Sequence, residues 1–264
     1  TMTVTVTVSG ADDAVSAGGD QTGAVTEDAT ATTATGTVAA SDDDADSAFT
    51  YAIGTAAGTY GSLAIDSAGA WTYTIDNSAA ATTALDAGDA PTDAFTITVT
   101  DTSSTLTDTM TVTVTVSGAD DAVSAGNDGT GAVTEDATAT TATGTVVASD
   151  ADADSAFTYA IGTAAGTYGT LTMTGADWTY TIDNSAAATN ALAHDGSGND
   201  VFTITVTDTS STLTDDMTVT ITVSGANDDP TLATAQADAS AAEDAAYSLD
   251  VSGNFADVDV GDTL

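Results

Sequence analysis

Glutamate is the rarest acidic residue in this chain, and its placement is regular. The three glutamates, Glu27, Glu135 and Glu243, are spaced by 108 residues, and each is followed directly by an aspartate. If the acids served only solubility, Glu and Asp would mix freely. A single glutamate at one repeat position indicates a longer, bidentate carboxylate that reaches a cation. The spacing therefore predicts a cation ligand at the same point of each repeat.

Aspartates gather in the segments between the predicted strands. In a seven-strand antiparallel sandwich, successive loops alternate between the two ends, so the acids after one repeat's first strand, the linker and the next repeat's acidic loop should converge at each junction. Uncompensated carboxylates repel one another, whereas hard divalent ions such as Ca²⁺ would join them through oxygen ligands. The candidate ligands are Glu27, Asp42, Asp44, Asp46, Asp86, Asp89, Asp101, Asp120, Asp121, Asp150, Asp152, Asp154 and Asp208, with Asp12 and Asp13 in the equivalent joint near the start.

Two other interpretations of the acids exist. A halophilic surface also selects solvated acidic loops, so calcium dependence and general halophily both remain open. The Asp-x-Asp-x-Asp spacing is also found in EF-hand loops, but the glycine at loop position 6 and the glutamate at position 12 are missing, which excludes that motif.

Composition limits the partners and the chemistry. The 264 residues include no Lys, Arg or Cys and 40 acids, for a formal charge of −40. Nothing could neutralise the phosphates of nucleic acid or of an anionic membrane surface, and disulfides are excluded. There is no apolar run long enough for direct membrane insertion. The single histidine, His194, lies in the loop-like sequence AHDGSGND without a partner set for catalysis, so we expect no enzyme.

The elements that must position the acids are strands. In Thr109–Asp121 (TMTVTVTVSGADD), Thr and Val alternate with period two and an acidic joint follows. The same stretch opens the chain and returns at Met217–Asp228. We expect the last strand of a preceding repeat at 1–10, full repeats at 11–118 and 119–225, and the start of a divergent repeat at 226–264. The chain is then a window on a longer protein.

Turn signals divide the first repeat into strand candidates of a sandwich. The predicted fold is all-β, with tandem seven-stranded antiparallel sandwiches arranged end to end. Trp71, Tyr73 and Phe95 fall in period-two register with Ile and Val, which favours core packing over a sugar-stacking platform. The predicted strands are Thr22–Thr26, Thr32–Ala40, Ala48–Ile53, Tyr60–Ile65, Ala70–Asp76, Ala94–Thr100 and Thr107–Ser117.

Several motifs resemble a known superfamily. GTYGSL with AWTYTIDNSAAATTAL (Gly58–Leu85), DAFTITVTD (Asp93–Asp101) and TVTVTVSGADD recur in the second repeat. They are similar to the cadherin-like superfamily and, more closely, to VCBS repeats of large bacterial RTX-type surface adhesins. The opening of the third repeat resembles a dystroglycan-type cadherin-like domain.

The resemblance implies calcium at the junctions. The first junction would use Glu27, Asp86, Asp89, Asp120 and Asp121, then Asp150 with Asp152 (or Asp152 with Asp154), and Asp208. The next junction would use Glu135, Asn227, Asp228, Asp257 and Asp259. The linker here is shorter than the family's, and the acidic pair becomes Ala193 and Gly196 in the second repeat, with Asp195 shifted.

The expected function is a secreted, extracellular structural module, a calcium-stiffened stalk of a large surface adhesin or fibre. Its partners would be adjacent repeats of the same chain and, in a fibre, identical chains. The alternatives are a filament subunit joined by strand donation and a glycan or cell-surface binding module. The near-identity of the two full repeats favours a spacer over a receptor site.

Overall fold

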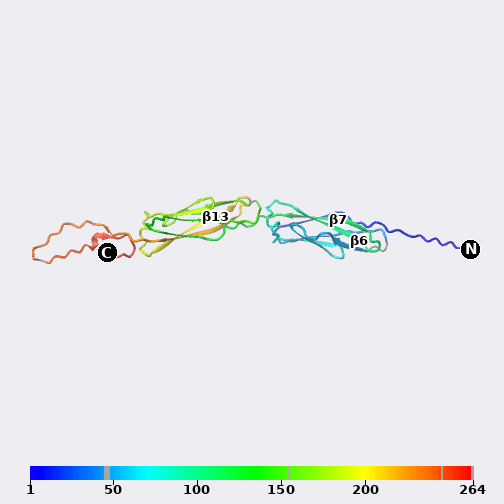
Figure 1. Cartoon of the computed structure of the whole chain (residues 1–264), viewed down its shortest axis with the longest axis horizontal. Helices are drawn as coiled ribbons and strands as arrows, with labels where there is room; N and C mark the ends of the chain where they lie inside the picture. The colour runs from blue at the N-terminus through cyan, green and yellow to red at the C-terminus, as the bar shows by residue number, and fades with distance from the viewer. Residues whose placement is uncertain (45–47, 154, 245, 263–264) are drawn as a thin grey trace. The chain divides into compact units, whose positions relative to one another are not determined.

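The structure is a computed structural model that describes residues 1–44, 48–153, 155–244 and 246–262. The chain divides into two compact units: Thr1–Asp121 with Ala151–Asp154, and Ala122–Asp150 with Ser155–Leu264. Each unit holds one β-sandwich, with β6 and β7 labelled in the first and β13 in the second (Figure 1). The all-β tandem sandwich prediction is confirmed.

The first sandwich has two sheets with strand orders β1-β7-β6-β3 and β2-β5-β4. The seven strands fall on the seven predicted segments, and the largest difference is at the second strand, which is shorter than expected. They are Gln21–Thr26 (β1), Thr33–Thr37 (β2), Phe49–Ile53 (β3), Gly61–Ile65 (β4), Ala70–Ile75 (β5), Thr92–Asp101 (β6) and Thr107–Ser117 (β7).

The second sandwich repeats this topology with sheets β10-β13-β14-β8 and β11-β12-β9. Its strands are Gly129–Thr134 (β8), Thr141–Thr145 (β9), Phe157–Ile161 (β10), Gly169–Thr174 (β11), Asp177–Ile182 (β12), Ser197–Asp208 (β13) and Thr214–Ser224 (β14).

Period-two alternation builds the core of each sandwich. Along β7, Met110 is 2% exposed and Val112, Val114 and Val116 are fully buried, while the threonines between them are more exposed. The core interpretation of the aromatics is confirmed as well: the rings of Tyr73 and Phe95 lie 5.8 Å apart inside the first sandwich.

One strand pair in each sandwich is parallel. β1 pairs with β7, with Val25 opposite Val116, and β8 pairs with β14 in the same way. Strands joined by short loops must run antiparallel, whereas the first and last strands of a repeat are far apart in sequence and are free of that constraint. This pairing sets the end of β1 beside the end of β7, where the linker begins.

The flanking segments contain little regular structure. Residues 1–10, expected to form the last strand of a preceding repeat, form no strand, and Met2 is 94% exposed. A strand needs a hydrogen-bonding neighbour, so alternation alone does not produce one. After the second sandwich, Thr231–Leu232 (β15) pairs with Phe255–Ala256 (β16) next to the short 3₁₀ helix η1, Ser252–Asn254. Among the described residues, no helix is long and apolar enough to cross a membrane.

A buried carboxylate sits in each sandwich. Asp93 is 3% exposed and accepts hydrogen bonds from the Thr59 amide at 2.7 Å, the Tyr60 amide at 3.1 Å and the Tyr73 hydroxyl at 2.8 Å. Burial, and then the Asp93 carboxylate, raise the pKa of Tyr73, so the phenol stays protonated as a donor. A Cβ at Gly58 would collide with this carboxylate, which explains the glycine in the GTYG turn.

Asp200 makes the same contacts in the second sandwich. It accepts from the amides of Thr167 and Tyr168 at 2.6 and 3.0 Å and from the Tyr180 hydroxyl at 2.8 Å. Three hydrogen-bond donors therefore compensate the Asp200 carboxylate, in a chain that has no Lys or Arg to pair with it.

We expect Asp200→Asn to lower the free energy of unfolding by about 1–3 kcal/mol. The NH₂ group of asparagine replaces one carboxylate oxygen, so it faces other hydrogen-bond donors, and these donors lose their acceptor. Urea unfolding measures the loss. Asp216→Asn is the matched control: it also removes one charge, but Asp216 is exposed. Equal stability of the two variants would contradict the role given to Asp200.

Candidate metal centre

Each acidic joint is tied to an Asp-x-Asp loop by the same hydrogen bond. The Asp13 amide donates to Asp44 at 2.7 Å, and the Asp121 amide donates to Asp152 at 2.8 Å. The Asp228 amide donates to Asp259 at 2.9 Å. The two partners are 31 residues apart in every case. The repeated bond fixes a carboxylate of the loop beside the linker.

The loop itself is also held by its first aspartate. Asp42 accepts the Asp44 amide at 3.0 Å, and Asp257 accepts the Asp259 amide at the same distance. Asp150 and Asp152 are the residues at the corresponding sequence positions of the second repeat. Asp46 and Asp154 lie outside the described residues.

Glu27 is the centre of an acidic cluster within the first compact unit. The β1–β7 pairing ends with the Glu27 amide donating to the Ser117 carbonyl at 2.9 Å, which turns Glu27 toward the linker. Its side chain is 2% exposed. Oε2 accepts from the Ala119 amide at 3.4 Å, and Oε1 has no hydrogen-bond partner among the described residues.

The surroundings of Glu27 disfavour its charge. Burial, and then the carboxylates of Asp121, Asp28 and Asp152, raise the pKa of Glu27 to about 7. The Ala119 hydrogen bond opposes this shift. A carboxylate placed in this way releases its proton more readily when a cation joins it.

Glu135 is the centre of the equivalent cluster within the second compact unit. It is also 2% exposed, its amide donates to the Ser224 carbonyl at 2.9 Å, and Oε2 accepts from the Ala226 amide at 3.2 Å. Burial, and then Asp228, Asp136 and Asp259, raise its pKa.

The second cluster contains three closely spaced aspartates. Carboxylate oxygens of Asp257, Asp259 and Asp262 all lie within 4.8 Å of one another. Asp259 is 4% exposed. Asp259 Oδ1 and Asp228 Oδ2 are buried and have no hydrogen-bond partner in the described part of the chain. Burial, and then Asp259, raise the pKa of Asp228.

These oxygens fit a hard cation. Ca²⁺ takes six to eight oxygen ligands from carboxylates, carbonyls and water. Buried carboxylate oxygens without a donor are costly unless a cation or proton joins them. The donor set of each cluster therefore suits calcium, with Glu27, Asp121 and Asp152 in the first and Glu135, Asp228, Asp257 and Asp259 in the second.

Other candidates are used differently in the structure. Asp101 and Asp208 are fully buried, and each accepts hydrogen bonds from two serine hydroxyls and two serine amides of its own turn. Hydrogen bonds from the serine hydroxyls are the largest cause that holds the pKa of both carboxyls well below the usual range. Both oxygens of these carboxylates already have donors, and their role as metal ligands stays a prediction.

The acidic loop before β6 lies beside the linker. Asp120 accepts the Ala87 amide at 3.0 Å, and the Gly118 amide donates to the Asp89 carbonyl at 3.0 Å. Asp86 is half-buried and Asp89 is exposed. Asp12 and Asn227 are exposed as well, and Asn227 donates to the carbonyl of Asp228.

In the second repeat this acidic pair is missing. Ala193 and Gly196 take its place, and the shifted Asp195 points away: its side chain is 91% exposed, with φ of +66°, 3.7 Å from His194. The second cluster instead gains Asp262, which the sequence analysis missed. The signal was the Asp-x-Asp-x-x-Asp spacing of residues 257–262, where the earlier repeats have serine in the last place.

The chain is similar to several solved structures. The chain has a TM-score of 0.48 and 16% identity to protocadherin gamma B7 cadherin domains 1–4, covering 86% of this chain and 54% of that one. For mouse PcdhgC3 domains 1–3 the values are 0.43 and 16%, covering 82% and 69%. For Drosophila N-cadherin domains 1–4 they are 0.30 and 15%, covering 77% and 48%. The chain thus spans about half the length of the first structures it matches.

An endo-fucoidan hydrolase also matches, with a TM-score of 0.32 and 18% identity, covering 81% of this chain and 29% of that one. No curated protein matches the sequence.

The family assignment comes from the sequence itself. The model of the bacterial cadherin-like domain matches residues 11–118 and again residues 119–225. Such domains are non-enzymatic, typically extracellular modules of adhesion or structure that contact neighbouring domains or identical chains. The chain, with two tandem copies, therefore belongs to the bacterial cadherin-like domain family.

Proposed function

We propose that this chain is a calcium-stiffened spacer of a secreted bacterial surface protein, of the kind found in large adhesins or fibres. The observation that carries the proposal is the repetition of one cluster at the same repeat position. Glu27 and Glu135 are both buried, and the same type of linker hydrogen bond brings Asp152 and Asp259 to them.

The third glutamate supports this interpretation by contrast. Glu243 occupies the same sequence position as Glu27 and Glu135, yet it is exposed. No strand of the described chain holds it beside a linker in the way that β1 and β7 hold Glu27. Burial of the glutamate therefore accompanies a complete sandwich, and Glu243 serves as an internal control.

Calcium would act on these clusters as a clamp. Without a cation, the gathered carboxylates repel one another and fray the hydrogen bonds between linker and loop. With Ca²⁺, the same oxygens become ligands that join a β-strand end, the linker and an Asp-x-Asp loop, so the linker loses freedom to bend. Because the ion binds the folded chain, it also stabilises the fold by mass action.

The expected affinity fits an extracellular location. Extracellular calcium modules bind at roughly 0.1–1 mM, so calcium outside the cell fills such sites while cytosolic calcium leaves them empty. A chain of this kind would be flexible during export and become stiff outside. Its partners would be adjacent repeats of the same protein and, in a fibre, identical chains.

Thermal and urea unfolding in EDTA, in about 5 mM calcium chloride and in sodium chloride of equal ionic strength tests the calcium sites. We expect calcium to add about 1–2 kcal/mol per bound ion to the free energy of unfolding. Glu27→Gln and Glu135→Gln should each lose part of that gain, whereas Glu243→Gln, which removes the same charge, should keep all of it. Equal stabilisation by the sodium salt would show that screening of the acidic chain is responsible, and the proposal would fail.

The pH dependence in EDTA is a second test. The pKa of Glu27 is raised from 4.5 to about 7 in the folded chain, so the folded chain keeps a proton that the unfolded chain loses between these values. The contribution of Glu27 to the free energy of unfolding is therefore present at pH 4.5 and is lost as the pH rises through about 7. This loss lowers the free energy of unfolding by about 1–3 kcal/mol. Glu135 has the same sign.

Chemical unfolding between pH 4.5 and 7.5 measures this slope. The difference in stability between wild type and Glu27→Gln should follow the window of Glu27, while Glu243→Gln should parallel wild type. Calcium should abolish the difference in slope, because the ion takes the place of the proton. A Glu27→Gln variant with the wild-type slope in EDTA would rule out this origin.

A further inference from the structure

One group of differences between the two repeats lies around the buried tryptophan. Trp71 of the first repeat and Trp178 of the second occupy the same position on β5 and β12. Near them, Gln21 of the first repeat is replaced by Gly129 in the second. Gly19 becomes Asn127 and Ala39 becomes Val147 in the same neighbourhood.

In the first repeat the Gln21 side chain closes this region. The Trp71 indole Nε1 donates to Gln21 Oε1 at 2.7 Å, and Gln21 Nε2 donates to the Thr37 carbonyl at 2.6 Å. A carboxamide thus bridges a tryptophan donor on one strand and a backbone acceptor on another. Both groups, which would otherwise lack a protein partner, are satisfied.

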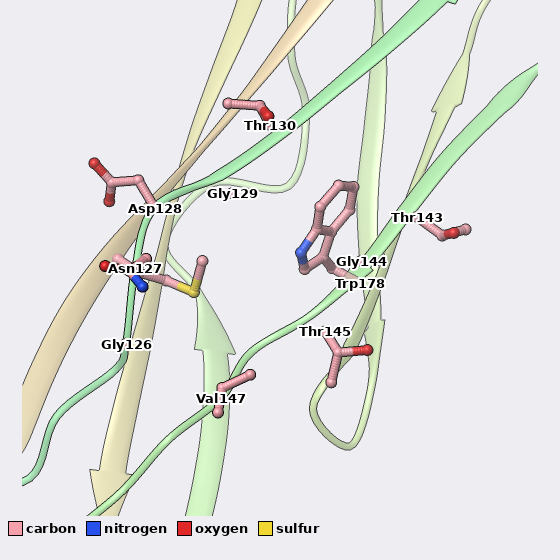
Figure 2. A pocket seen from close by; sticks show the side chains of 11 residues that line it. Gly126, Asn127, Asp128, Gly129, Thr130, Thr143, Gly144, Thr145, Val147 and Trp178 are labelled. Carbon is pink, nitrogen blue, oxygen red and sulfur yellow. The ribbon is translucent and has the colours of Figure 1, made fainter.

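In the second repeat the carboxamide is missing and a pocket of about 370 Å³ takes its place. Asn127, Asp128, Thr130, Val147 and Met217 line it together with Trp178 (Figure 2). The indole nitrogen of Trp178 faces the side of the pocket where Gly129 lies (Figure 2). It has no hydrogen-bond partner among the described residues, although the whole side chain is only 3% exposed.

The second repeat also keeps the backbone carbonyl that corresponds to the one Gln21 bonds in the first repeat. β9 is the edge strand of its sheet, and the Val146 amide donates to the Ala176 carbonyl at 2.9 Å. In an antiparallel pair the hydrogen-bonded and non-hydrogen-bonded positions alternate, so the carbonyl of Thr145 points away from β12. It corresponds to the Thr37 carbonyl that Gln21 bonds in the first repeat.

The pocket therefore keeps a donor and an acceptor in the arrangement that a carboxamide bridges elsewhere in the same chain. Its volume is in the range of small-ligand sites. The Asp128 carboxylate at its edge, which accepts the Thr218 amide at 2.8 Å, disfavours an anionic ligand. Asn127 and Thr130 add polar groups for the remainder of a ligand.

We propose that the second repeat binds the carboxamide group of a small neutral ligand in this pocket. The carbonyl oxygen of the ligand accepts from the Trp178 indole, and its N–H donates to the Thr145 carbonyl. A primary carboxamide, as on a glutamine side chain, and the acetamido group of an amino sugar share this chemistry. This site is separate from the calcium clusters and does not depend on their function.

The chain is suited to a direct test, because its two tryptophans give two indole N–H signals in a nitrogen-15 NMR spectrum. Propionamide, which reproduces the side chain of Gln21, is titrated into the labelled chain, and N-acetylglucosamine forms the second arm. Propionate and glucose are the controls that lack the amide. We expect the Trp178 signal to shift and saturate in roughly the millimolar range, while the Trp71 signal stays in place.

The arms separate the ligand sources. Tighter binding of N-acetylglucosamine than of propionamide supports an amino sugar, and the reverse supports a primary carboxamide. A Trp178 signal that does not shift with either amide, or that shifts equally with propionate and glucose, overturns the proposal.

Exchanging the single residue between repeats provides the matched variants. Gly129→Gln should fill the pocket and abolish the shift of Trp178, and Gln21→Gly should make the Trp71 signal respond to propionamide. A Cβ at Gly129 would lie 3.3 Å from Val219 Cγ2 and 3.5 Å from both Met217 Cε and Trp178 Cζ2, so the neighbouring Val219 has to shift by only a few tenths of an ångström. Gly129→Ala, which only narrows the pocket, serves if the larger side chain disturbs folding. Unchanged binding by Gly129→Gln with a native spectrum would place the ligand elsewhere and refute the site.

Discussion

The absence of any Lys or Arg governs this protein. In most proteins a buried carboxylate can pair with a basic side chain, but here 40 acids share one histidine, which is itself exposed beside Asp195. A carboxylate that leaves water must therefore receive N–H or O–H donors, keep its proton, or bind a cation from outside. The structure contains the first solution and, at Glu27 and Glu135, the conditions for the other two.

N–H and O–H donors compensate buried carboxylates where the fold needs a fixed turn. Asp93 and Asp200 collect backbone amides and a tyrosine hydroxyl, and Asp208 collects serine hydroxyls and amides. These carboxylates organise loops from within. Among the described residues, Glu27 receives one long amide bond on Oε2 and faces other carboxylates, so these residues do not compensate its charge. The difference between the two groups separates structural acids from candidate ligands better than burial alone, since all of them are buried.

Near-identical repeats make small differences informative. Most positions of the second repeat copy the first, so each departure is a substitution within an unchanged framework. Replacement of Asp86 by Ala193 alters the acids near one linker, and replacement of Gln21 by Gly129 removes a side chain that held an indole and a carbonyl together. A spacer that only extends would have no need to open a pocket in one copy, which is why Gly129 stands out against the structural role of the rest.

Within the two sandwiches the sequence by itself determined the strands, because period-two alternation and turn residues act locally. Residues 1–10 alternate in the same way but form no strand, since a strand also needs a hydrogen-bonding neighbour. The sequence also identified Glu27 and Glu135, since a lone glutamate at a fixed spacing is visible without coordinates. Tertiary structure decided which acids are compensated: Asp101, Asp208 and Glu27 all looked like ligands, and only the placement of donors distinguishes them. The parallel pairing of β1 with β7, the partners of Asp93, the place of Asp262 in the second cluster and the pocket at Trp178 depend on residues far apart in the chain, whose proximity the pattern of single strands does not encode.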